Sequence, residues 1–157
     1  MMNRLQAGSN VGLVRRLRSR SGGAALELAV VMPVLILIAI GVMDYGRVFF
    51  TSVAVSNAAR AGAEWGAQGN AEAMQQANIE NFAKLDGAEA SPITVTSQTI
   101  CRCGATTVGC TSTCSGGYGA PRVFVEVTAS KSVTLLLPYP GLPSSISISR
   151  TATFRAQ

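Results

Sequence analysis

The chain has 157 residues and a formal net charge of +5, with 48% hydrophobic residues, 13% charged residues and no histidine. The length suits one modest domain, but soluble domains usually have about a quarter of their residues charged. The lack of histidine excludes His-based triads and histidine metal ligands. No convergent acid pair or phosphate-binding loop is apparent, so we expect a non-enzyme without cofactor or metal.

Residues 1–22 form a basic leader that we expect to be cytoplasmic. Residues 23–157 hold as many acidic as basic residues, so the net charge comes from five arginines of the leader: Arg4, Arg15, Arg16, Arg18 and Arg20. A basic leader ahead of an apolar run follows the positive-inside rule of membrane proteins. Nucleic-acid binding, which needs a clustered basic surface, is the weaker interpretation, and we expect no nucleic-acid partner.

Residues 23–47 are predicted to form a transmembrane helix. Leu28–Met43 contains no charge, and extension back to Ala24 gives 20 residues interrupted only by Glu27. About 20 residues are needed to cross a bilayer. A cleaved signal peptide is the alternative, but its apolar region is shorter. We therefore expect a retained single-pass anchor with the main domain on the non-cytoplasmic side.

The membrane exit is predicted at Asp44-Tyr45-Gly46-Arg47. Asp44 and Arg47 are spaced i,i+3, so their side chains can pair at the outer interface. Tyr45 is an aromatic residue of the kind that is enriched at membrane interfaces.

Residues 48–90 are predicted to form an extra-membrane helical region. The first helix should continue to about Gly66, with four small residues on one face: Ala54, Ala58, Gly62 and Gly66. Small residues at this spacing allow close approach by another helix, or by the sheet of the same domain, and both interpretations stay open. A second helix is expected over residues 71–85, with an apolar stripe of Ala71, Met74, Phe82 and Leu85.

Residues 91–157 are predicted to form a β-rich domain, because the hydrophobic period changes to two from Pro92 onward. Four strands are expected, at residues 93–96, 123–128, 133–137 and 146–154. Arg150 falls on the apolar face of the last one. Residues 138–143 are rich in proline and should form a rigid connection. The expected class is α+β, with a long N-terminal transmembrane helix, a helical insert and an antiparallel sheet of about four strands.

A Cys-rich loop is predicted at residues 101–117, with Cys101, Cys103, Cys110 and Cys114. An even number of cysteines in a non-cytoplasmic domain indicates disulfides. Cys101 and Cys103 are too close to pair with each other comfortably, so each is expected to bond to Cys110 or Cys114. A Cys₄ zinc knuckle is the alternative and would suit a reducing compartment.

The junction from Gly22 to Glu27 is the most informative motif. Glu27 is a lone acid at the start of an apolar span, where a charge costs free energy. An acid held at the bilayer interface is the simple explanation. If the chain were instead cut after Gly22, Glu27 would be the fifth residue, and the new amine of Gly23 could neutralise the Glu27 carboxylate of a neighbouring subunit.

Gly followed by four residues and Glu before an apolar span is similar to the processing site of type IV pilin-like precursors. The longer stretch from Gly22 to Arg47, with Pro33 inside the span, resembles the TadE-like proteins of tight-adherence, Flp-type pilus systems. The helix that follows, with Ala58-Ala59-Arg60-Ala61-Gly62, also matches. Two features depart from the family pattern, namely Leu28 in place of an aromatic residue and the four clustered cysteines.

The resemblance implies a minor pilin or pseudopilin that takes part in assembling a tight-adherence type IV pilus for surface attachment. A prepilin peptidase would cut between Gly22 and Gly23, with Glu27 needed for processing, assembly or both. The implied partners are this peptidase, other pilins or pseudopilins, inner-membrane assembly proteins and membrane lipid. The implied location is the bacterial inner membrane, with a periplasmic C-terminal domain, and incorporation into an extracellular pilus stays open. An uncleaved, membrane-anchored periplasmic binding or scaffold protein is the alternative.

Overall fold

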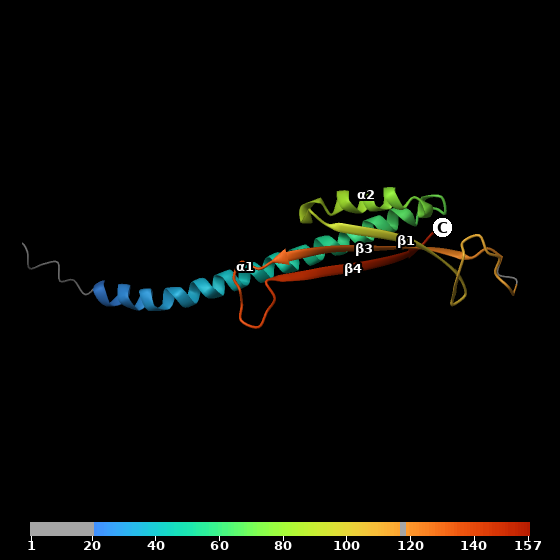
Figure 1. The fold of residues 1–157 in the computed structure, drawn as a ribbon. Helices are drawn as coiled ribbons and strands as arrows, with labels where there is room; N and C mark the ends of the chain where they lie inside the picture. The colour runs from blue at the N-terminus through green and yellow to red at the C-terminus, as the bar shows by residue number, and fades with distance from the viewer. Residues whose placement is uncertain (1–20, 117–118) are drawn as a thin grey trace, which may run out of the picture. The chain divides into compact units, whose positions relative to one another are not determined.

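A computed structural model describes residues 21–116 and 119–157, so all but the end of the predicted leader lies outside the described residues. The elements follow one another as α1 (Ser21–Gly66), η1 (Glu72–Met74), α2 (Gln76–Asp86), η2 (Ala88–Ala90), β1 (Thr94–Cys103), β2 (Thr106–Val108), β3 (Arg122–Thr134) and β4 (Ser145–Arg155) (Figure 1). The predicted α+β class, with a long apolar helix and four antiparallel strands, is confirmed. The chain divides into two compact units between Ala39 and Ile40, which are described separately.

In the first unit, the described residues all belong to α1. Side chains from Gly23 to Ala39 are exposed, and most are large and apolar. The helix continues through Pro33, although proline removes one intrahelical hydrogen bond. Within the described ranges, α1 is the one helix long and apolar enough to cross a membrane.

The second unit contains an antiparallel sheet with the strand order β2-β1-β3-β4. The prediction of separate strands at 123–128 and 133–137 is wrong. β3 runs without a break to Thr134, because its polar residues 130–132 keep their register with β4, as in the pair Lys131–Ile148. Leu135–Leu137 lie in the following loop, and the fourth strand is β2, inside the Cys-rich segment.

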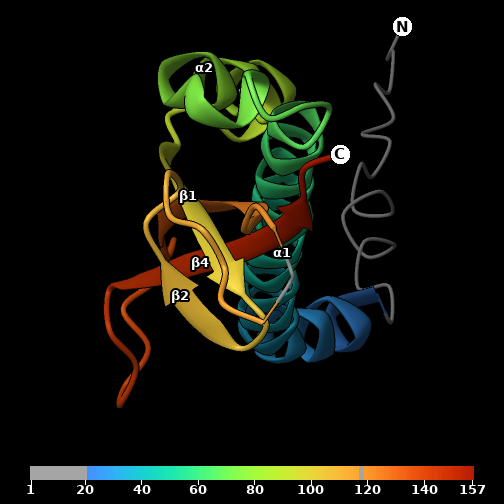
Figure 2. The ribbon, with the colours of Figure 1, turned by 90° about the vertical axis from the view of Figure 1, so that its right-hand side faces the viewer.

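The core lies where the C-terminal half of α1 meets one face of the sheet and α2. Fully buried residues of β3 (Val125, Val127 and Ala129) belong to one cluster with Val55, Ala59 and Ala63 of α1 and with Ile79 and Ala83 of α2. Figures 1 and 2 show α2 alongside both the last turns of α1 and β1. Arg150 lies between Ile148 and Ala152 on β4 and donates a hydrogen bond to Ser52 Oγ of α1 at 2.8 Å.

The small-residue face of α1 packs against its own chain. Ala58, Gly62 and Gly66 are buried, and Ala54 is half-buried. A Cβ atom at Gly62 would lie 2.8 Å from Ala83 Cβ, and one at Gly66 would lie 2.8 Å from Ile79 Cδ1 and 2.9 Å from Val125 Cγ1. The face therefore accommodates both a helix and the sheet of the same domain.

The predicted apolar stripe of the second helix is wrong. Met74, Phe82 and Leu85 are exposed, whereas Ala73, Ile79 and Ala83 are buried. The close approach to α1 explains the difference, because Ala83 lies against Gly62 and Ile79 fills the space that Gly66 leaves open. Phe82 instead stacks on the rim against Trp65, with 6.3 Å between ring centroids.

The free edge of β1 is covered by the helical region. Ser97 N–H donates to the Glu80 carboxylate at 3.2 Å, and the Ser97 and Thr99 hydroxyls donate to backbone carbonyls of Gln76 and Ala73. The Glu80 carboxylate thus occupies a backbone donor of β1 that a further strand could use, and the hydroxyl bonds hold the helical region against this edge.

We predict that Gly62→Ala destabilises the protein by about 1–3 kcal/mol, because the added methyl group overpacks the contact between α1 and α2. Thermal unfolding of the full chain in detergent, followed by circular dichroism, measures the effect. Gly46→Ala is the matched control, since a Cβ there meets nothing within 4 Å. Equal melting temperatures for Gly62→Ala and the parent chain would contradict the proposed close packing.

Candidate functional site

The candidate processing junction lies on the first turns of α1. The helix begins at Ser21, so the backbone of Gly22 and Gly23 is helical. Glu27 is exposed between Leu26 and Leu28, and its carboxylate has no hydrogen bond or ion pair with any other described residue. The acid is therefore presented at the surface of an otherwise apolar helix.

Asp44, at the predicted membrane exit, is the buried acid of the second unit, with 4% of its surface exposed. Both of its carboxylate oxygens accept the backbone N–H of Leu136 at 3.0 Å, and Oδ2 also accepts the Tyr139 hydroxyl at 3.2 Å. Arg47 Nη1 lies 3.6 Å from Oδ1, which is the i,i+3 pair expected from the spacing. Asp44 thus ties α1 to the β3–β4 loop (residues 135–144).

The Tyr139 hydroxyl is the neutral side-chain donor to Asp44. Burial raises the pKa of its hydroxyl above the usual value of about 10, and the hydrogen bond to Asp44 and the negative charge of Asp44 raise it further. The pKa of Tyr139 is higher in the folded state than in the unfolded state. The contribution of its neutral hydroxyl to the free energy of unfolding is therefore fully present below about pH 10 and is lost as the pH rises through the raised pKa. At neutral pH the hydroxyl is protonated and donates to Asp44.

An apolar groove of about 250 Å³ lies beside Asp44. Gly41, Tyr45 and Val48 line it from α1, and Leu135, Tyr139, Leu142 and Ile146 line it from the loop and β4. Sequence reasoning identified Asp44 but missed this link to the loop, because the two partners are 92 and 95 residues away. In the sequence, the only sign of this contact is that residues 138–143 are uncharged, rich in proline and include a tyrosine.

Beyond the membrane exit, α1 also has an apolar side that no described residue covers. Tyr45, Phe49, Phe50 and Val53 are between 44% and 73% exposed. Tyr45 and Phe49 stack along the helix, with 6.4 Å between ring centroids. This exposed side, and not the small-residue face, is the part of α1 that is free to meet another molecule.

The four cysteines cross-link the β1–β2 hairpin, at the end of the sheet away from the β3–β4 loop. Disulfides join Cys101 to Cys110 and Cys103 to Cys114, which is one of the pairings expected from the sequence. The segment is partly β-structure, because β1 extends to Cys103 and pairs with β2. Disulfide sulfurs are not thiolates, so these cysteines do not form the alternative zinc knuckle. Across the described ranges, no cluster of residues could hold a metal ion.

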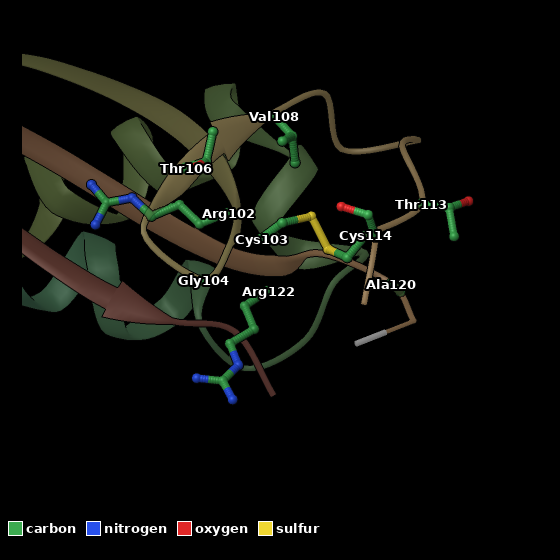
Figure 3. A pocket seen from close by; sticks show the side chains of 10 residues that line it. Arg102, Cys103, Gly104, Thr106, Val108, Thr113, Cys114, Ala120 and Arg122 are labelled. Carbon is green, nitrogen blue, oxygen red and sulfur yellow. A yellow bond between two sulfur atoms is a disulfide. The ribbon is translucent and has the colours of Figure 1, made fainter. Parts of the chain in front are cut away.

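A second cavity, of about 540 Å³, opens at this hairpin. Figure 3 shows the Cys103–Cys114 bond among its lining residues, with the Arg102 and Arg122 side chains extending away from the bond. These arginines are directly opposite each other on β1 and β3, and Arg102 lies 5.4 Å from the Phe124 ring centroid. None of the described residues that line the cavity is acidic, so its chemistry suits an anionic group.

Comparison with known proteins gives one match. Residues 22–64 match the family model described as TadE-like protein, in agreement with the resemblance noted from Gly22 to Arg47. The matched segment is about a quarter of the chain and covers the junction, the apolar span, the membrane exit and most of the small-residue face. No curated protein and no solved structure matches the chain.

We predict that Asp44→Ala lowers the free energy of unfolding by about 1–3 kcal/mol, because the Leu136 N–H and the Tyr139 hydroxyl lose their acceptor. Arg47→Ala should cost less than about 1 kcal/mol, since that ion pair is long and half-exposed. Thermal unfolding of the full chain in detergent compares the two variants. A larger effect for Arg47→Ala would show that the ion pair, and not the loop contact, is what stabilises this site.

We predict that peptide mapping of the non-reduced protein recovers the two crosslinks Cys101–Cys110 and Cys103–Cys114. Mass spectrometry after digestion between the cysteines identifies each pair, and a reduced sample is the control. Four free thiols, or a bond from Cys101 to Cys114, would contradict the observed pairing.

Proposed function

We propose that this chain, which is TadE-like over residues 22–64, is a minor pilin or pseudopilin that takes part in assembling a tight-adherence pilus for surface attachment. The match to the TadE-like model carries the proposal, because it covers the Gly22–Glu27 junction together with the apolar helix that follows. The remaining points of the proposal concern processing, location and assembly.

We propose that a prepilin peptidase cuts between Gly22 and Gly23. The peptide bond lies next to small residues and directly before an apolar helix, and Glu27 is exposed on that helix. Cleavage would remove the basic leader and create a free amine at Gly23. An exposed acid five residues into the new chain is then available to pair with the amine of a neighbouring subunit, which offsets the cost of a charge among apolar helices.

The proposed location is the bacterial inner membrane, with the leader cytoplasmic and the second unit periplasmic. The apolar helix is long enough to span, and the arginine-rich leader supports this orientation. The two disulfides also suit an oxidising periplasm. Inner-membrane assembly proteins and lipid would be the first partners.

For assembly with other pilins, we propose the exposed side of α1 that includes Tyr45, Phe49 and Val53. These exposed apolar residues follow the apolar run in the sequence. The small-residue face is less suitable, because α2 and β3 already occupy it. Packing of exposed aromatic residues against a neighbouring helix would bury apolar area on assembly.

The second candidate is an uncleaved, membrane-anchored binding or scaffold protein. The cavity beside Arg102 and Arg122 favours it, since an exposed arginine pair is suited to a carboxylate or phosphate on a partner. In that case Glu27 would have no role in function, and the hairpin would carry the activity. The two candidates are separated by the state of the N-terminus and by the effect of replacing Glu27.

We predict that the chain purified from membranes of cells with the cognate peptidase begins at Gly23, as N-terminal sequencing would show. Gly22→Leu should leave the leader attached. Glu27→Ala should abolish processing or piliation at normal protein levels, whereas Glu64→Ala, at another exposed acid of α1, should not. A mature chain that keeps the leader, with piliation unaffected by Glu27→Ala, would favour the binding protein.

A further inference from the structure

The β3–β4 loop has an unusual composition for a loop outside a membrane. No charged residue lies between Lys131 and Arg150, and the loop itself contains four leucines, three prolines and a tyrosine. Leu136 and Leu142 are 54% and 59% exposed. Surface loops are usually polar, so exposed leucines on a loop of this kind indicate a contact that is missing from the isolated chain.

The position of the loop identifies that contact. Asp44 holds it against α1 through the Leu136 N–H and the Tyr139 hydroxyl. The loop also reaches toward the apolar span, since a Cβ at Gly41 would lie 3.9 Å from Tyr139 Oη. Gly41 precedes Asp44 by three residues, or about 4.5 Å of helix rise, and belongs to the apolar run. The headgroup region on each side of a bilayer is of similar thickness, about 5–8 Å.

We infer that the β3–β4 loop is a second membrane contact, which lies in the headgroup region at the end of the span and turns Leu136 and Leu142 toward the acyl chains. The loop and the last turn of the span belong to the same compact unit, so the loop lies beside the span's end. Tyr139, with an apolar ring and a hydroxyl bound to Asp44, is of the type that prefers the interface.

The loop is also prepared for this role by its backbone. Leu135 N–H donates to Ser144 O at 3.0 Å and Leu142 N–H donates to Tyr139 O at 3.1 Å, so these two donors are already satisfied. Pro138, Pro140 and Pro143 have no N–H to bury and restrict the chain. The loop carries no charge, and these positions leave no backbone N–H without a partner. The free-energy cost of moving it into a low-dielectric region is therefore reduced.

The inference rests on the membrane anchoring in the proposed function, but not on the pilus role. It is tested with the full chain in phosphatidylcholine–phosphatidylglycerol vesicles that carry bromine, a fluorescence quencher, at shallow or deep acyl positions. Trp65 is the only tryptophan, so Trp65→Phe, which keeps an aromatic ring against Phe82, gives a silent background. Single tryptophans are then introduced as Leu142→Trp and, independently, Leu136→Trp.

Two further probes make the outcomes distinguishable. Leu35→Trp, inside the span, reports anchoring, and Thr107→Trp, on exposed β2, is the matched control within the second unit. The Cys-rich hairpin and the β3–β4 loop lie at opposite ends of β3 (Figure 1). A strand of 13 residues is about 40 Å long, so the two segments are far apart. Only one of these ends can lie in the interface beside Gly41.

We expect shallow-brominated lipid to remove most of the fluorescence of Leu142→Trp and Leu136→Trp, and deep-brominated lipid to remove that of Leu35→Trp. Thr107→Trp should keep its fluorescence in both. If Leu35→Trp is quenched but both loop probes behave like Thr107→Trp, the loop contact is refuted while anchoring stands, as when a second copy covers the loop. If Leu35→Trp is not quenched, anchoring and the loop contact both fail.

Discussion

The close contact between the small-residue face of α1 and the rest of the domain is the constraint on which the second unit depends. With only hydrogen atoms at Gly62 and Gly66, α1 approaches Ala83 and Ile79 of α2 and Val125 of β3 to van der Waals distance. Larger residues at either position would force α2 and the sheet apart. One helix therefore supplies both the apolar span and the central support of the folded domain.

This contact also explains which side of the helical region is buried: Ala83 faces Gly62, and Ile79 fills the space beside Gly66. An apolar period places Met74, Phe82 and Leu85 on one stripe, but the partner surface accepts Ala73, Ile79 and Ala83. The hydrophobic pattern of one helix cannot reveal how near its partner lies, so tertiary packing overrides the amphipathic signal. The sequence alone thus predicts that a second helix exists, but not which side of it is buried.

The antiparallel class of the sheet and its three long strands were predictable, since their alternation of apolar and polar residues is local, whereas the short β2 was not predicted. The boundaries of the strands were harder to predict. β3 continues through Ser130, Lys131 and Ser132 because β4 pairs with it in register, and that pairing is a long-range property. The junction at Gly22–Glu27 and the acid at Asp44 were visible as charges beside an apolar run. The acceptors and donors that surround Asp44 come from a loop some 90 residues later, and no local pattern indicates them.

The surfaces of the chain are divided between internal contacts and exposed sides. The small-residue face of α1 is used within the chain, the β3–β4 loop satisfies Asp44, and the hairpin is held by its own disulfides. On α1, the first part with Glu27 and the aromatic side beyond Asp44 stay exposed. For a helix meant to meet other helices, these are the surfaces expected to be free.

The covered edge of β1 has a consequence for how copies of this domain can meet. Glu80 accepts the Ser97 N–H of β1 and Ala73 O accepts the Thr99 hydroxyl, whereas β4 pairs with β3 on one side and has no strand on the other within the described residues. Growth of a continuous sheet from one molecule to the next is therefore hindered along the part of β1 that β2 leaves unpaired, and of the two outer strands, the three-residue β2 and the longer β4, only β4 offers a long open ladder. Strand pairing between two β4 edges would join two molecules and leave no second long edge for extension.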